Sequence, residues 1–245
     1  MISNPELRRE ASGILRRAQV SFPAFAGFSL LVSAALSVLD VLCSGSTYED
    51  LAAAGPVGTF VYILVLLISL LLEAGRVEYC GAAIRGERAE YGDLFCGFSY
   101  VFRFLGVLLT QALLVGVGFL FFFIPGILLL YRYRFALYVL CEDPSQSITA
   151  VLRRSAAELN GFRWQLFRLD LSFLPYALLC LVPVLLWDYA AMEPIAALSA
   201  PLSALLSTVV TFPTLLLTFW RTAAEMELRR RILEGDPAAQ PPELS

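Results

Sequence analysis

One long apolar run limits the possible folds of this chain more than any other feature. The 38 residues from Phe104 to Cys141 are predominantly apolar, and one glutamine and two arginines are the only strongly polar residues among them. A helix that crosses a bilayer needs about 20 apolar residues, so the run has nearly the length of two spans. Pro125 and Gly126 lie close to its middle, and a proline-glycine pair breaks a helix. The run therefore predicts either a tight helical hairpin or a single long, kinked span.

The distribution of arginine decides between these two alternatives. All basic residues of the chain are arginines. With a hairpin, every arginine outside the run falls on one side of the membrane, together with both termini. The two loops on the opposite side then contain Glu49, Asp50, Asp188 and Glu193 but no arginine. Since positive charge gathers in cytoplasmic loops, the pattern favours a hairpin and places both termini in the cytoplasm.

Composition agrees with a membrane protein and removes several kinds of chemistry. Hydrophobic residues make up 58% of the 245 positions, charged residues only 16%, and the mean hydropathy is +0.72. The chain has no histidine, the usual general base and the commonest metal ligand. Its five cysteines are scattered without metal-ligand spacing. We therefore expect no catalytic centre, no cofactor and no metal site.

The expected fold is an all-α bundle of about six transmembrane helices in a single membrane domain, residues 1–235. Residues 236–245 form a polar tail that is expected to be disordered. Cytoplasmic amphipathic helices are predicted to lie in the membrane interface at about 5–18, 87–100 and 144–160. The predicted spans cover about 21–42, 57–80, 104–123, 126–141, 169–187 and 195–220.

The third interfacial helix has marked ends. Asp143 suits its N-cap, Pro144 its first position, and Gly161 lies where a helix would stop. A similar layout, an amphipathic stretch with a glycine followed by two spans, recurs around Gly13 and Gly97. This suggests a threefold repeat of helix-plus-hairpin units. Alternatively, each interfacial helix simply needs a glycine hinge where it enters the membrane.

Three stretches together resemble the DUF975 family of uncharacterised bacterial integral membrane proteins. They are IRGERAEYGDLFCGF, IPGILLLYRYRFALYVLCEDP and RRSAAELNGFRWQLFRLDLSF, which lie within residues 76–175. The chain departs from the family at Leu129, where a lysine is frequent, and at Met226-Glu227, where the family has an aromatic pair. The resemblance implies an integral membrane protein and supplies no biochemical activity.

Charges inside the predicted spans are the first candidates for a functional role, because burying them in lipid is costly. Arg132 and Arg134 are two residues apart, so on a helix they point to roughly opposite sides. One is expected to face the bundle and the other to reach the interface. A buried ion pair with Asp40, Asp188, Glu73 or Asp170 is one explanation. The alternative is a site for an anion or a lipid headgroup.

Asp170 lies where the fifth predicted span enters the membrane. It could stabilise a helix N-terminus, pair with a nearby arginine, or couple transport to a proton or an ion. The complete set of candidate structural or functional residues combines these charges with the break, the turn and the family motifs. It consists of Pro125, Gly126, Arg132, Tyr133, Arg134, Asp143, Pro144, Gly161, Trp164, Asp170 and Ser172.

Two classes of function follow from these features. The leading hypothesis is a non-enzymatic accessory or scaffold protein of the cell membrane, whose partners are membrane lipid or a membrane protein such as a transporter subunit. The alternative is a transporter or permease for a small solute or lipid, with a mid-membrane site near the break at Pro125-Gly126. No nucleic-acid partner is expected.

Overall fold

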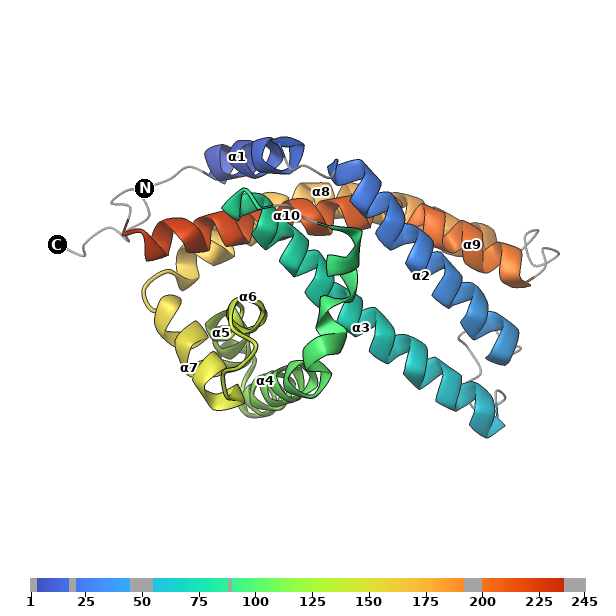
Figure 1. Ribbon diagram of the computed structural model, residues 1–245, viewed down its shortest axis with the longest axis horizontal. Helices are drawn as coiled ribbons and strands as arrows, with labels where there is room; N and C mark the ends of the chain where they lie inside the picture. Colours follow the sequence, from blue (N-terminus) through green and yellow to red (C-terminus); the bar gives the residue numbers. More distant parts are fainter. Residues whose placement is uncertain (1–3, 18–20, 45–54, 88–89, 192–199, 236–245) are drawn as a thin grey trace.

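A computed structural model describes residues 4–17, 21–44, 55–87, 90–191 and 200–235 of the chain, and every regular element in these ranges is a helix (Figure 1). The predictions for Glu49, Asp50 and Glu193 and for the tail 236–245 concern residues outside this description.

Six described stretches are long and apolar enough to cross a membrane. Most residues in each of them face outward rather than into the protein, as lipid-facing helices do. The predicted fold class, an all-α protein with six apolar candidate spans, is confirmed. The stretches are α2 (Phe22–Ser44), α3 (Gly55–Arg85), η1 (Tyr91–Tyr100) with α4 (Val101–Phe121), α5 (Phe123–Arg132) with α6 (Ala136–Glu142), α8 (Arg163–Ala191), and α9 (Ala200–Val210) with α10 (Phe212–Leu233).

The hairpin is present, but its break lies before Pro125-Gly126. Phe122 alone is extended, with φ −161° and ψ 150°, and it separates α4 from α5. Pro125 falls in the first turn of α5, where a residue without an N–H is tolerated because that donor has no partner in the helix. The two helices pack closely, and Gly126 is buried against the ring of Phe119.

Two further breaks have no proline-glycine signal. Residues 133–135 form a turn between α5 and α6, and Thr211 separates α9 from α10. The returning arm of the hairpin is therefore a helix of only ten residues followed by a bend. α10, in contrast, continues to Leu233, beyond the predicted span end at residue 220, with Arg230 paired to Glu227 and Glu234 along its surface.

The buried core lies at the arginine-rich end of the spans. Phe25 of α2 stacks on Tyr79 of α3 with ring centroids 4.1 Å apart, and Phe219 of α10 meets both rings edge-on. Beside this cluster, η1 lies against α3 backbone to backbone. A side chain at Gly75 would overlap the backbone of Leu94. The glycine thus permits a contact that any larger residue would prevent.

Helices outside the spans are α1 (Asn4–Arg17) and α7 (Ile148–Glu158), and both bury one face. In Figure 1, α1 lies over α10, and its Leu7, Ala11 and Leu15 are buried there. The predicted interfacial helix at 87–100 is the 3-10 helix η1, which begins at Tyr91.

The order of a short helix followed by two longer stretches occurs three times. α1 precedes α2 and α3, η1 precedes α4 and the α5–α6 stretch, and α7 precedes α8 and the α9–α10 stretch. The three glycines of the suggested repeat do not occupy equivalent places. Gly13 lies within α1 with open space around it, whereas Gly97 contacts the α3 backbone at Leu71. Gly161 follows α7 with φ +89°. Each glycine answers a different local requirement.

Candidate functional site

The N-terminal part of α8, the middle of α10 and the bend after α5 meet in a cluster of paired charges. The Arg221 guanidinium lies 2.9 Å from the Asp170 carboxylate and also 2.9 Å from the Glu225 carboxylate, four residues further along α10. Arg134 donates two hydrogen bonds to Glu225, at 3.0 and 3.2 Å. The Glu225 side chain is 1% exposed, so a carboxylate at the centre of the protein holds two arginines together.

Two tyrosines complete this cluster. The Tyr131 hydroxyl donates to Asp170 at 2.9 Å, and the Tyr138 hydroxyl donates to Glu225 at 2.7 Å. Two carboxylates thus face two guanidiniums and accept two further hydrogen bonds. Buried charges persist only when they are paired and hydrogen-bonded in this way. The formal charge of the four ionised groups sums to zero, which fits a role in fixing helix positions.

Arg132 and Tyr133 lie outside the cluster. Arg132 ends α5 with its side chain exposed, and its guanidinium carbon is 5.8 Å from the centre of the Tyr133 ring. Arg134 points inward, so the two arginines face different ways, as predicted. The partner of Arg134 is Glu225, however, and not one of the four carboxylates considered from the sequence.

A groove of about 500 Å³ opens beside Asp170 and Arg221. Its remaining walls are mainly apolar, with Tyr131, Thr214 and Thr218 adding hydroxyl groups. Because Asp170 and Arg221 already pair with each other, neither presents an uncompensated charge to a ligand. Of the roles considered for Asp170, the structure shows an ion pair: its arginine, Arg221, comes from α10, and Asp170 lies well inside α8 rather than at its first residue.

A second set of charges joins α10 to α6 and α7. Arg229 is 3% exposed; it donates to both carboxylate oxygens of Glu158, at 2.7 and 3.1 Å, and to Glu142. Arg154 contacts the same two carboxylates, at 3.0 and 3.1 Å. The surface helix α7 is therefore fastened to the end of the last span by a buried guanidinium.

The turn before α7 differs from the prediction. Ser147, and not Asp143, is the N-cap of α7, and its hydroxyl accepts a hydrogen bond from the amide of Ala150. Asp143 instead organises the preceding turn, accepting hydrogen bonds from the backbone and hydroxyl of Ser145 and from the Gln146 amide. These bonds, led by that of the Ser145 hydroxyl, hold the pKa of Asp143 below its ordinary value. The carbonyl of Pro144 accepts a hydrogen bond from Arg103.

Pro125 and Gly126, where the sequence predicts the break, lie inside α5, and the space around Gly126 is filled by protein. The Phe119 ring lies over Gly126, and a side chain at Gly118 would meet both Gly126 and Leu129. The groups at this point are apolar, unlike the unwound segments that line transporter sites.

Three candidate residues lie where α7 gives way to α8. Gly161 adopts the left-handed backbone that ends a helix, at φ +89°. Trp164 is 64% exposed and stacks on Phe167. The Ser172 hydroxyl donates to the carbonyl of Leu169, and its own carbonyl accepts a hydrogen bond from Arg8 at 3.0 Å.

This last contact belongs to a clamp that holds α1 in place. The Arg8 guanidinium also lies over the Tyr176 ring, 5.4 Å from its centre, while the Trp220 indole donates to the Arg8 carbonyl at 3.0 Å. One arginine of α1 thus ties the helix to α8, and its backbone is tied to α10.

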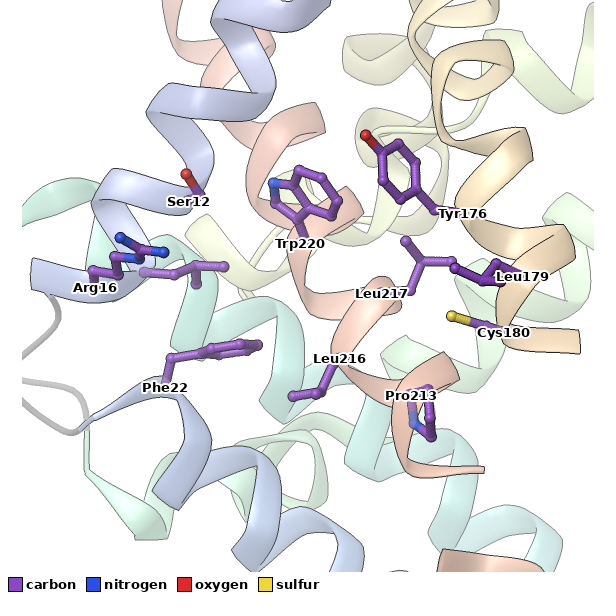
Figure 2. Close-up of a pocket in the computed structure, with 11 residues that line it drawn as sticks. Ser12, Arg16, Phe22, Tyr176, Leu179, Cys180, Pro213, Leu216, Leu217 and Trp220 are labelled. Atoms are coloured by element: carbon purple, nitrogen blue, oxygen red, sulfur yellow. The ribbon is translucent and has the colours of Figure 1, made fainter. Parts of the chain in front are cut away.

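Beside the clamp lies an apolar groove that we call the α1 groove (Figure 2). Its volume is about 420 Å³, within the range of about 300–1,000 Å³ typical of ligand pockets. Arg16 and Ser12 of α1 stand at one side of it, and Trp220 lies nearby. The rest of the lining comes from Leu15, Phe22, Tyr176, Leu179, Cys180, Pro213, Leu216 and Leu217.

Arg16 differs from the arginines of the two ion-pair clusters. Its side chain is exposed, and it makes no ion pair with any residue in the described ranges. It is therefore a cation with free donors next to an apolar groove.

The sequence alone did not identify the residues that form ion pairs in the two clusters, namely Arg221, Glu225, Arg229 and Glu142. It does indicate one of these contacts, because Arg221 and Glu225 are four residues apart and so face each other on a helix. Their contacts with α5, α6, α7 and α8 depend on tertiary packing, which spacing along the chain does not reveal.

Comparisons with known proteins found no match among curated proteins and none among solved structures. The family described as "Protein of unknown function (DUF975)" matches residues 107–189, a stretch that runs from α4 through the hairpin and α7 into α8, and so confirms the resemblance there.

Proposed function

We propose that the protein is a non-enzymatic accessory protein of the membrane that binds an anionic phospholipid in the α1 groove. The observation that carries this proposal is the position of Arg16, which has no ion-pair partner among the described residues, beside an apolar groove along α8 and α10. An anionic phospholipid has the same two parts, a negatively charged phosphate group and an apolar chain.

Position supports the same ligand. The groove begins at α1, an arginine-bearing amphipathic helix, and continues along the apolar part of α10 from Trp220 to Pro213. Tryptophan and arginine both favour the level of lipid headgroups. A phosphate near Arg16 would leave the acyl chain beside Leu179 and Leu216, which face the groove (Figure 2).

The transporter hypothesis has less support. Its proposed site is filled by Phe119, and the charges of Arg134 and Asp170 are taken up by pairs within the protein. A scaffold needs neither a route through the membrane nor free charges inside it. The two networks of ion pairs, which fix α7, α8 and α10, are consistent with a rigid surface at the inner side.

The test uses quenching of Trp220, which lines the groove, by brominated lipids. Trp164 and Trp187 are first replaced by phenylalanine, and the protein is reconstituted with brominated phosphatidylglycerol or brominated phosphatidylcholine. We expect stronger quenching by the anionic lipid, and we expect Arg16→Gln to remove the difference. Arg153→Gln, an exposed arginine on α7, is the matched control and should preserve it. Equal quenching by the two lipids in the parent protein would contradict the proposal and favour a protein partner for this surface.

A further inference from the structure

We propose that the α4–α5 hairpin is re-entrant: it enters the membrane from the cytoplasmic side and returns without reaching the other face. The chain would then cross the membrane four times, through α2, α3, α8 and the α9–α10 stretch. This inference is independent of lipid binding in the α1 groove, because the two features share no residue.

The first argument comes from the reach of the helices. Tyr131, Asp170 and Arg221 are joined by hydrogen bonds of 2.9 Å, so they lie at one level of the protein. From Asp170, α8 runs 21 residues to Ala191, or about 32 Å at 1.5 Å per residue. This matches the roughly 30 Å of hydrocarbon in a bilayer.

The stretch of α9 and α10 from Arg221 back to Ala200 also covers 21 positions, equivalent to about 32 Å of helix. From Tyr131 back to Phe123, in contrast, α5 covers eight positions, or about 12 Å. The tip of the hairpin therefore extends less than half as far beyond the common level as its neighbours do. Figure 1 looks almost along α4 and α5 while α2, α3 and α9 run across the view, and such a tilt reduces the depth further.

The second argument is the chemistry of the tip. Residues 112–130 contain no polar side chain. The five side chains around the turn are each more than 70% exposed in the isolated protein; they are Leu120, Phe121, Phe122, Phe123 and Ile124. A turn in water at the far face would expose this apolar surface, whereas a turn within the lipid would bury it. The two outer loops of the sequence, by comparison, contain Glu49, Asp50 and Glu193.

The third argument concerns the backbone of the turn. In the hydrocarbon region there is no water to satisfy exposed N–H and C=O groups. The Phe122 N–H donates to the Gly118 carbonyl at 3.1 Å, and the Phe122 carbonyl accepts from the Gly126 N–H at 3.3 Å. The one extended residue of the hairpin therefore has both backbone groups bonded within the protein, so it adds no unpaired backbone group to the turn.

Charge distribution is compatible with either topology, since a re-entrant hairpin and a crossing hairpin both return the chain to the cytoplasmic side. The positive-inside pattern therefore cannot separate them. The length of the helices beyond their common level and the apolar side chains of the turn do distinguish the two topologies, and both favour the shallow hairpin.

The experiment is labelling of Phe122→Cys in sealed vesicles with a membrane-impermeant maleimide, measured as the increase over the parent protein. We expect no increase from either side and full labelling after unfolding in detergent. Ser46→Cys, in a loop predicted to lie outside, is the control for accessibility from that face. Labelling of Phe122→Cys from the outer face would overturn the proposal, and so would labelling from the cytoplasmic face, which would place the tip in water.

A second variant tests the proposal independently in case Phe122→Cys does not fold. Phe122→Trp, with the three native tryptophans replaced by phenylalanine, should be strongly quenched by bromine within the acyl chains. A protein that retains only Trp187, predicted at the outer interface, provides the reference for shallow quenching. The hairpin crosses the membrane if two results are found together. The tryptophan at position 122 would be quenched by acyl-chain bromine no more strongly than Trp187, and Phe122→Cys would be labelled from the outer side.

Discussion

Arg134 and Glu225 lie 91 positions apart in the chain and meet through two hydrogen bonds of 3.0 and 3.2 Å. The pair joins the bend after the hairpin to the last helix. Glu225 also accepts from Tyr138 of α6 and from Arg221 of its own helix, and Arg221 pairs with Asp170 of α8. Through these contacts the stretch after α5, α8 and α10 are held in register.

We expect Glu225→Gln to destabilise the protein strongly. Removing one partner of a buried ion pair costs about 3–5 kcal/mol, and the lower part of that range applies because Arg134 is 32% exposed. The measurement is thermal unfolding in detergent. Arg132→Gln is the control, since this arginine is exposed and two positions from Arg134, and its unfolding temperature should stay close to that of the parent. Equal effects would rule out a special role for the Glu225 cluster.

The hairpin should tolerate no side chain at Gly126. Leucine there would collide with Phe119, and forcing extra volume into such a contact costs about 1–3 kcal/mol. Gly116 has nothing within 4 Å of where its side chain would begin, so Gly116→Leu on the same hairpin is a matched control. We expect only the first variant to lower stability in detergent, and a similar loss in both would mean that the hairpin is not closed in this way.

Gly161 and Gly13 should respond to alanine in opposite directions. Gly161 has φ +89°, a conformation that costs alanine about 1 kcal/mol or more. Gly13 lies inside α1, where alanine favours the helix by about 0.5–1 kcal/mol. Thermal unfolding of the two variants therefore distinguishes local roles from a shared repeat, because equivalent positions would change in the same direction.

Arg229→Gln should release α7 from α10. The substitution leaves Arg154 as the partner of both Glu142 and Glu158. Because Arg154 is exposed to solvent, its ion pairs stabilise the protein only weakly. We expect faster hydrogen exchange in residues 148–158, with α4 unchanged. Arg153→Gln on the outer face of α7 is the control, and exchange that rises equally in both variants would argue against the buried guanidinium as the fastening.

Each feature of the sequence predicted only the structural property on which it directly depends. Length and apolarity located the six stretches, because a bilayer imposes both directly. The arginine distribution indicated a hairpin but could not report its depth. Pro125 indicated a break three residues too late, since proline is accommodated in the first turn of a helix and the chain turned at Phe122 instead.

Partners of the charged residues were the least predictable part. Asp170 was considered with nearby arginines, yet its partner Arg221 comes from a helix 51 positions away. Likewise, Asp143 has the residue type of an N-cap, but the helix begins only after Ser147. The partner of Asp170 is set by packing between distant helices, whereas Asp143 is held in a local turn by hydrogen bonds from Ser145 and Gln146.

The charged half of α10 has a consequence for how the protein is made. Arg134 and Asp170 have their ion-pair partners only on this last helix, and Glu142 and Glu158 have their buried partner, Arg229, there as well. The helix also contacts α1, α2, α3 and α9. While the ribosome is still producing residues up to 220, Arg134 and Asp170 lack these partners, and Glu142 and Glu158 have only Arg154. We therefore expect the nascent chain to remain a loose assembly until its final segment emerges. A chain stopped after Trp220 should accordingly be degraded rapidly in a pulse-chase experiment, and a long-lived truncated product would refute this order of assembly.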